Sequence, residues 1–213
     1  KAFDMNYTWE FHHITNEIAR GDKTVDDLEA YFVRHDSIWD PAIYRMNFIT
    51  NHDENSWAGT VFERYGEAVE VYAFLTFVVP GMPLIYSGQE AGLDKRLRFF
   101  EKDTVDWSDL SWEAVYTDFI AMKKENEVFR NGETGGDMKV IVLTDAESVF
   151  AFERSTEDSR VVILANLGKK KASVQLDERY QEREWVEYFS QDEVDAADKI
   201  EVKGYGYKML IEE

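Results

Sequence analysis

Two stretches of this sequence decide its fold: FITNHD at residues 48–53 and GMPLIYSGQE at residues 81–90. Each is a short apolar run that ends abruptly in polar residues. In a parallel barrel the strand interiors are apolar, and the chemistry lies at the carboxyl ends of the strands. The pair His52-Asp53 at such an end would offer a hydrogen-bond donor and an anion to a bound ligand. The two stretches therefore predict strands that carry a functional site.

The composition is that of a folded, acidic chain without cysteine. Of the 213 residues, 44% are hydrophobic, which is ample for a core. The formal charge is −19, and nucleic-acid binding calls for the opposite sign, so we expect no nucleic-acid partner. The lack of cysteine excludes disulfides, thiolate metal sites and cysteine nucleophiles. No apolar run is long enough to span a bilayer, so we expect no membrane segment.

Strand-like and helix-like patterns alternate over the first part of the chain. We predict strands at residues 2–7, 44–50 and 82–86, and helices at residues 10–20, from residue 24 onward and at residues 66–79. The last helix is apolar almost throughout, which suits a helix packed on a sheet, and Pro80 ends it. This alternation is typical of βαβ units around a parallel sheet.

The pattern changes at NGETGG, residues 131–136, to short β-rich runs separated by turn-forming clusters. These runs lie at residues 139–143, 149–152, 161–165, 172–176, 185–189 and 205–211. Regularly spaced short strands are typical of an antiparallel sandwich. We therefore predict two domains, residues 1–131 and 132–213, and we expect residues 137–213 to fold on their own.

Taken together, FITNHD and GMPLIYSGQE closely resemble the last conserved strands of the α-amylase family of glycoside hydrolases. The resemblance implies a (β/α)8 TIM barrel followed by a C-terminal antiparallel β-sandwich, that is, an α/β part plus an all-β part. A complete barrel typically takes about 250 residues. We therefore expect this chain to hold only barrel units six to eight and the sandwich, with most of the catalytic machinery preceding Lys1.

The resemblance assigns roles to three residues. Glycosidic cleavage passes through an oxocarbenium-like state, which a nearby carboxylate stabilises. In the family, the aspartate of the matching Asn-His-Asp stabilises this state without attacking or protonating the sugar, and we expect the same of Asp53. The adjacent histidine binds the same sugar, a role that falls to His52. DMNY at residues 4–7 resembles the sixth barrel strand more weakly, and Tyr7 is a candidate to stack on a sugar face.

Other parts of such a site are not found in this sequence. The family's nucleophile is an aspartate two residues after an arginine, and its general acid is a glutamate that ends the next strand; we find neither pattern. We therefore expect the chain alone to be inactive. We also predict no metal site, because His12 and His13 would point about 100° apart on a helix. No cofactor is evident, and a family-type calcium site would lie upstream.

The function implied by the resemblance is that of a retaining α-glucan hydrolase or transglycosylase acting on starch or malto-oligosaccharides. Two alternatives stay open: a non-catalytic, amylase-like interaction subunit, and a glycan-binding module based on residues 137–213. We interpret Phe99, Phe100 and Trp107 as packing residues. The open edge of a partial barrel favours self-association. The sequence does not fix substrate length, linkage, oligomeric state or compartment.

Overall fold

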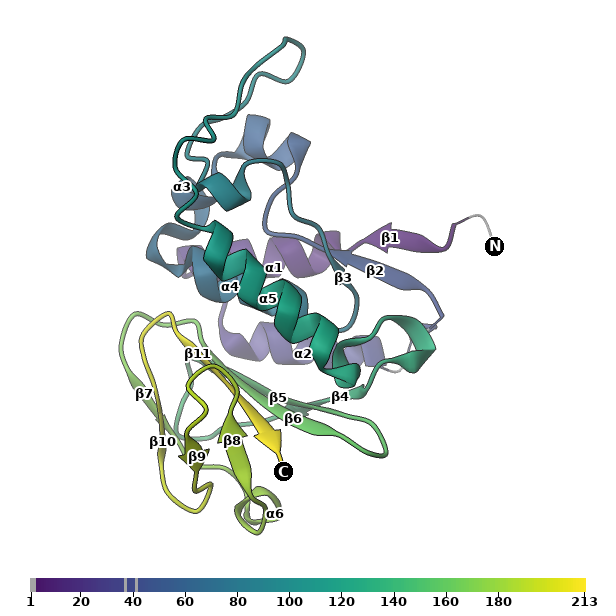
Figure 1. Ribbon diagram of the computed structural model, residues 1–213, viewed down its shortest axis with the longest axis vertical. Coiled ribbons are helices and arrows are strands. Elements are labelled where there is room, and N and C mark those ends of the chain that lie inside the picture. The colour runs from purple at the N-terminus through teal and green to yellow at the C-terminus, as the bar shows by residue number, and fades with distance from the viewer. Residues whose placement is uncertain (1–2, 37, 41) are drawn as a thin grey trace.

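A parallel sheet with helices forms the first part of the chain, and two antiparallel sheets form the second part (Figure 1). The computed structural model describes residues 3–36, 38–40 and 42–213. Ala2, at the start of the first predicted strand, lies outside them. The elements of the first part are β1 (Met5–Tyr7), α1 (Trp9–Arg20), α2 (Val25–Asp36), β2 (Tyr44–Asn47), η1 (Glu54–Ala58), α3 (Val61–Tyr65), η2 (Gly66–Ala68), α4 (Val69–Val78), β3 (Met82–Pro83), η3 (Gln89–Ala91) and α5 (Glu113–Glu125). Those of the second part are η4 (Glu127–Phe129), η5 (Gly132–Thr134), β4 (Asp137–Ile141), β5 (Val149–Ser155), β6 (Arg160–Asn166), β7 (Ala172–Val174), α6 (Glu178–Gln181), β8 (Trp185–Glu187), β9 (Glu193–Val194), β10 (Ile200–Val202) and β11 (Tyr207–Glu212).

The parallel sheet has the order β1-β2-β3, and the predicted alternation of strands and helices is confirmed. The second and third strands are shorter than expected. β2 ends at Asn47 instead of residue 50, and β3 ends at Pro83 instead of residue 86. Beyond the paired residues of β2 and β3, one further backbone hydrogen bond runs from Leu84 N to Asn47 O at 2.7 Å. After it, the two segments separate into loops. Among the described residues, β1 and β3 each pair only with β2, so their outer edges are open.

Helix α4 is apolar almost throughout, and it is buried almost throughout. All of its residues except Glu70 are buried. The ring of Phe74 stacks on that of Tyr207 in the second part of the chain, with centroids 4.0 Å apart. The helix ends at Val78, and Pro80 follows as predicted. Although α4 is apolar, no described helix is both long and apolar enough to cross a membrane.

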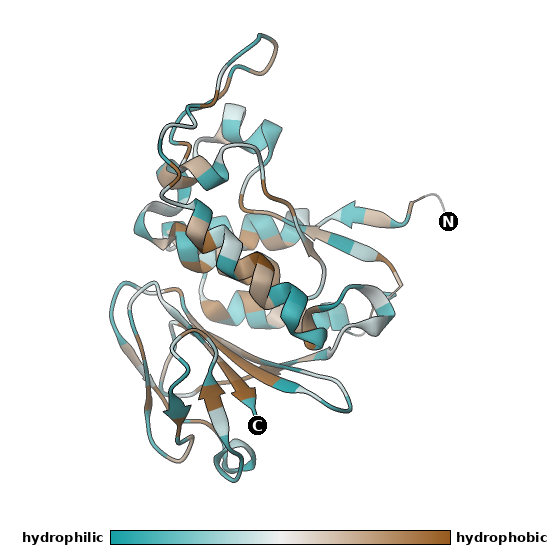
Figure 2. Cartoon of the chain, viewed as in Figure 1, coloured by the Kyte–Doolittle hydropathy of each residue, from teal (hydrophilic) through white to brown (hydrophobic). Residues whose placement is uncertain are grey.

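The six-stranded sheet, with the order β4-β5-β6-β11-β8-β9, has both of its faces buried. Because successive strand residues face opposite ways, Phe150, Phe152 and Ile163 pack in one core with the helices of the first part. Ala151 and Leu164 pack in a second core with the β7–β10 pair. Figure 2 shows the central strands as an apolar band. The predicted antiparallel sandwich is confirmed, while the boundary after residue 131 stays a prediction.

Candidate active site

The segment after β2 brings the predicted pair to the surface. Phe48 and Asn51, at the two ends of the apolar run, are both buried. The side chains of His52 and Asp53 that follow are 60% and 47% exposed, and His52 Nε2 lies 3.6 Å from Asp53 Oδ2. The two groups form an ion pair when the imidazole is protonated. An exposed carboxylate after a parallel strand lies at the end of the sheet where barrel enzymes carry their chemistry.

Tyr7 lies at the same end of the sheet, because it ends β1, the strand beside β2. It is 41% exposed. Its ring meets the ring of Phe48 edge-on, with centroids 5.5 Å apart, and Trp9 lies 5.9 Å away. Within the described part of the chain, the ring contacts of Tyr7 do not reach His52. The structure therefore joins Tyr7 to the FITNHD segment through Phe48 and not through the pair itself.

A wide helical turn fixes the backbone on which the pair is mounted. Asn51 Oδ1 accepts the backbone N–H of Glu54 at 2.9 Å, and the carbonyl oxygen of Asn51 accepts that of Asn55 at 2.9 Å. The turn η1 is a π-helix, a form that recurs at functional sites. The sequence pattern assigns Asn51 no separate role. Its bonds to Glu54 and Asn55 fix the backbone between residues 51 and 55, which presents His52 and Asp53 just before η1.

A buried polar network centred on His12 holds the same segment from inside. His12 Nδ1 lies 3.2 Å from the carbonyl oxygen of Phe48, and its Nε2 lies 2.9 Å from Glu54 Oε2. Arg64 donates from Nη2 to the carbonyl oxygen of Ile49 at 2.7 Å. Burial lowers the pKa of His12, although Glu54 opposes this, and the hydrogen bond with His12 lowers the pKa of Glu54. These contacts tie α1 to the chain on both sides of the pair.

Three aromatic side chains extend the surface beside the pair. The ring of Phe99 lies 5.8 Å from that of His52, and the rings of Trp57 and Phe100 lie 5.4 and 4.8 Å from that of Phe99. Phe100 is 85% exposed and Trp57 is 63% exposed. The interpretation of Phe99, Phe100 and Trp107 as packing residues is therefore wrong for Phe100, and Trp107 is itself 50% exposed.

One signal could have found this surface from the sequence. In RFFEK, residues 98–102, the aromatic pair is flanked by charges and follows neither a strand nor a helix period. An aromatic pair in this pattern would not lie on the buried face of a helix or of a strand. Trp57 carries no comparable signal, because its exposure depends on the π-helical turn that follows Asp53.

The segment GMPLIYSGQE, residues 81–90, mainly holds the loop that follows β3, as expected for Gln89 and Glu90. Gln89 Oε1 accepts the backbone N–H of Tyr86 at 2.7 Å, and its Nε2 donates to Tyr116 Oη at 2.6 Å. Glu90 Oε2 accepts the N–H of Gly88 at 3.2 Å. Gly88 has a φ of 102°, which a residue with a side chain rarely adopts. The motif thus shapes the loop that leads toward Phe99.

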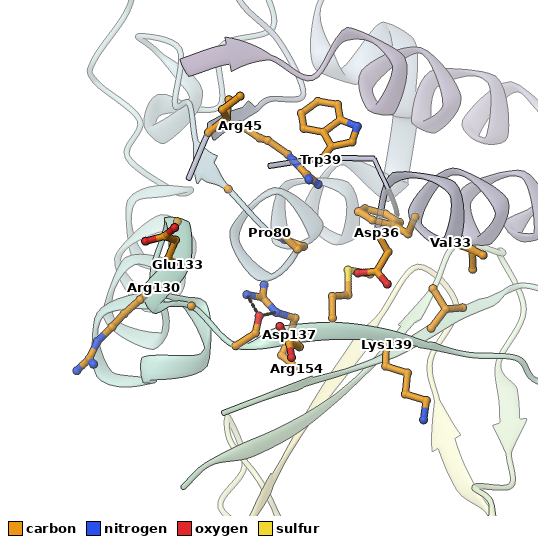
Figure 3. Close-up of a pocket in the computed structure, with 18 residues that line it drawn as sticks. Val33, Asp36, Trp39, Arg45, Pro80, Arg130, Glu133, Asp137, Lys139 and Arg154 are labelled. Carbon is orange, nitrogen blue, oxygen red and sulfur yellow. Dashed lines mark hydrogen bonds between the residues drawn. The ribbon is translucent and has the colours of Figure 1, made fainter. Parts of the chain in front are cut away.

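A cavity of about 670 Å³ lies at the opposite end of the parallel sheet (Figure 3). Its lining includes Arg45 near the start of β2, Gly81 directly before β3, and Arg154 of β5. Arg45 lies over the ring of Trp39, with its guanidinium carbon 3.9 Å from the ring centroid. In parallel barrels this amino end of the strands serves stability and not catalysis. We therefore assign the cavity to the junction between the two parts of the chain.

Within residues 3–36, 38–40 and 42–213, no group of three or more histidine, aspartate and glutamate side chains could hold a metal ion. His12 and His13 are neighbours on α1, but the ring nitrogens of His12 already face Phe48 and Glu54. We assign no residue to a metal or a cofactor.

The chain is similar to known amylases over nearly its whole length. Residues 1–139 match the family model described as the α-amylase catalytic domain, and residues 140–209 match the maltogenic amylase C-terminal domain. A curated relative, the α-amylase MalA of Haloarcula japonica, is 24% identical over 180 residues, which cover 82% of this chain and 26% of MalA.

Solved amylase structures share the fold. The maltogenic α-amylase AmyB from Thermotoga neapolitana has a TM-score of 0.82 and 20% identity, over 99% of this chain and 51% of AmyB. An α-amylase from Lactobacillus plantarum has a TM-score of 0.79 and 19% identity, over 99% of this chain and 47% of that enzyme. The fold is therefore the C-terminal part of a (β/α)8 barrel followed by an antiparallel β-sandwich. The chain spans about half the length of these two structures.

Proposed function

Since this chain belongs to the α-amylase family of glycoside hydrolases, we propose that it acts within a retaining enzyme that cleaves or transfers the α-glucosidic bonds of starch or malto-oligosaccharides. One observation carries the proposal: Asp53 is exposed beside His52 at the carboxyl end of β2, while the run before it is buried. The patterns of the family's nucleophile and general acid are not found in this sequence. In this proposal they are supplied by sequence that precedes Lys1.

Each residue has a role that follows from its chemistry. The carboxylate of Asp53 is a fixed negative charge, which stabilises the positive charge that develops on the sugar during cleavage. His52 donates a hydrogen bond to a hydroxyl of the same sugar. Tyr7 offers a half-exposed ring to an apolar sugar face from the neighbouring strand. Only the first of these interactions grows mainly in the transition state, so Asp53 is the residue whose loss should reduce kcat most.

The substitution Asp53→Asn tests this role in the enzyme that contains this chain. It keeps the size of the side chain and deletes the charge. We expect kcat to fall by roughly a hundredfold to several thousandfold, which corresponds to about 3–5 kcal/mol, with little change in substrate affinity. Asp198→Asn, at an exposed position of the sandwich, is the matched control. Near-normal kcat with a lowered melting temperature would make Asp53 a structural residue.

The proposal also states that this chain alone does not turn over substrate. Removal of a catalytic nucleophile typically costs several orders of magnitude in rate. The purified chain should release no reducing ends from starch, whereas the longer enzyme should. Turnover that stays with the chain through purification and is abolished by Asp53→Asn would show that no upstream group is needed.

The open edges of the parallel sheet favour association of the chain with a second copy of itself. β1 and β3 each present an unpaired edge among the described residues, and unpaired strand edges recruit other strands. Light scattering after size exclusion should give a mass that rises with the concentration of the chain. A monomeric mass over the whole concentration range would contradict this proposal.

A further inference from the structure

We propose that Trp57 and Phe100 form a carbohydrate-stacking platform that extends the site of His52 and Asp53 along an α-glucan chain. The inference rests on the proposed function and adds a binding subsite to it. It starts from the exposure of these two residues, which are 63% and 85% exposed although their rings belong to a connected cluster of aromatic side chains. Large aromatic side chains normally contribute most of their stabilisation by burial, so this degree of exposure requires an explanation.

The cluster is continuous with the candidate active site. The rings of His52 and Phe99 are nearly parallel, at 28°, and those of Phe99 and Trp57 are inclined at 45°. Phe100 meets Phe99 edge-on at 75°, and its centroid lies 6.2 Å from that of Trp57. Phe99 therefore occupies the centre and is the least exposed of the three, at 39%. It acts as the support, while Trp57 and Phe100 offer free surface.

The two elements that carry these rings are bonded to each other. Asn55 Oδ1 accepts the backbone N–H of Leu97 at 2.7 Å, and its Nδ2 donates to the carbonyl oxygen of Lys95 at 3.0 Å. Ser56 Oγ donates to the carbonyl oxygen of Leu97 at 2.7 Å. Asn55 itself is buried. The π-helix that bears Trp57 is thus tied to the loop that bears Phe99, which projects from the body of the molecule in Figure 1.

A single carboxylate closes the base of that loop. Asp103 accepts the backbone N–H groups of Arg98 at 3.1 Å and Thr104 at 2.8 Å, and it pairs with Lys95 Nζ. The bond from Lys95 and the two backbone bonds lower the pKa of Asp103 to about 2. The loop is therefore ordered before a ligand arrives, which reduces the entropy lost on binding.

The chemistry of the surface favours a neutral sugar chain. A pyranose presents C–H groups on its faces and hydroxyls at its rim, so it packs on an aromatic ring while its hydroxyls bond to polar neighbours. Arg98, Glu101 and Lys102 flank the aromatic pair and supply such donors and acceptors. The formal charge of −19 and the nearby Asp53 both disfavour an anionic ligand. Continuity with His52 places the platform where the next sugar units of a bound glucan would pass.

Two measurements test the platform, one on this chain and one on the enzyme that contains it. Maltoheptaose is titrated into the 213-residue chain by calorimetry, and KM and kcat are measured on the enzyme with maltotriose and maltoheptaose. Trp57→Ala and Phe100→Ala should each weaken binding of maltoheptaose by roughly 3- to 10-fold and raise its KM by a similar factor. Neither should change kcat. Trp57→Phe should restore most of the loss.

The matched control is Trp107→Ala. Trp107 is 50% exposed on the same loop, and within the described residues it makes no ring contact with the cluster. The inference is overturned if Trp57→Ala and Phe100→Ala behave like this control while the wild type binds maltoheptaose; the proposed function would then still stand. It is also overturned if the two variants change the oligomeric mass and not the sugar affinity, because the surface would then bind another copy of the chain. Absence of any α-glucan binding or turnover by the wild-type enzyme would sink the proposed function itself.

Discussion

Arg154 on β5 donates an N–H from Nη1 to the carbonyl oxygen of Val78, 2.9 Å away at the end of α4. Its Nη2 donates to the carbonyl oxygens of Val128 and Gly136, each at 2.8 Å, and its Nε also reaches Gly136. Arg154 is 2% exposed, and burial lowers the pKa of its guanidinium to about 9. The carboxyl end of a helix is the negative end of its dipole, which favours a cation there. One side chain thus joins the barrel part to the sandwich.

Arg154→Leu should destabilise the whole chain. It would leave the carbonyl oxygens of Val78, Val128 and Gly136 buried without this donor, and an unpaired buried acceptor costs about 1–3 kcal/mol. Allowing for partial relaxation, we expect a loss of about 3 kcal/mol in the free energy of unfolding in urea. Arg98→Leu, which removes an exposed guanidinium, is the control. A loss no larger than that of the control would show that the junction does not depend on Arg154.

The same junction changes the expectation for the isolated sandwich. The sequence alone led us to expect residues 137–213 to fold on their own. In the structure, however, one face of the six-stranded sheet, including Phe150, Phe152 and Met209, is covered by the helices of the first part. Exposing that face would return a large apolar area to water. We now expect the isolated segment to aggregate or to lack a cooperative melting transition in circular dichroism. A soluble monomer with such a transition would support the earlier expectation.

The hydropathy pattern of the sequence predicted those helices and strands whose faces are buried. The continuous apolar runs of β5, β6 and α4 all follow from burial on more than one face. It did not predict η1, because a π-helical turn depends on a local backbone bond, here from Gly59 N to Glu54 O at 3.0 Å. The interpretation of Phe100 as a packing residue followed from the resemblance and not from a period, and it is wrong because the loop that Asp103 closes leaves this side chain exposed. The misses therefore concentrate around the candidate site, where local bonds override the period.

Acid should destabilise the chain through His12 and Glu54. Burial lowers the pKa of His12 below its ordinary 6.5, so the unfolded chain binds a proton that the folded chain excludes once the pH falls below 6.5. The lowered pKa of Glu54 adds a further loss below 4.5. The melting temperature should thus fall as the pH drops, and His12→Gln should flatten the upper section of the curve. Because the hydrogen bond with His12 lowers the pKa of Glu54, the same substitution should also reduce the loss below 4.5. His13→Gln, at the exposed neighbouring position, is the control, and a curve for His12→Gln that matches the curve for His13→Gln would contradict this role of His12.

Asp103→Asn should loosen the loop that carries the aromatic cluster. The amide keeps the shape of the side chain but loses the charge that binds Lys95 and the two backbone N–H groups. We expect faster limited proteolysis between residues 95 and 104 at neutral pH and weaker binding of maltoheptaose, with kcat unchanged in the enzyme. In the wild type the carboxylate should hold the loop at every pH above its ordinary 3.8 and release it only as the pH falls through about 2. Equal cleavage rates for the variant and the wild type would contradict this role.

His52→Ala should reduce both binding and turnover, and two further substitutions show why. His52 has two possible contributions: a hydrogen bond to a sugar hydroxyl, and ring contact with Phe99, whose centroid lies 5.8 Å away. Because the hydroxyl is already present in the ground state, the bond should act on KM as well as on kcat, in contrast to Asp53→Asn. A fall of about tenfold in kcat/KM is the expected scale for one such bond. His52→Gln keeps a donor without a ring, whereas His52→Phe keeps a ring without a donor. Recovery by Gln would assign the effect to the hydrogen bond with the sugar, and recovery by Phe would assign it to support of the aromatic cluster.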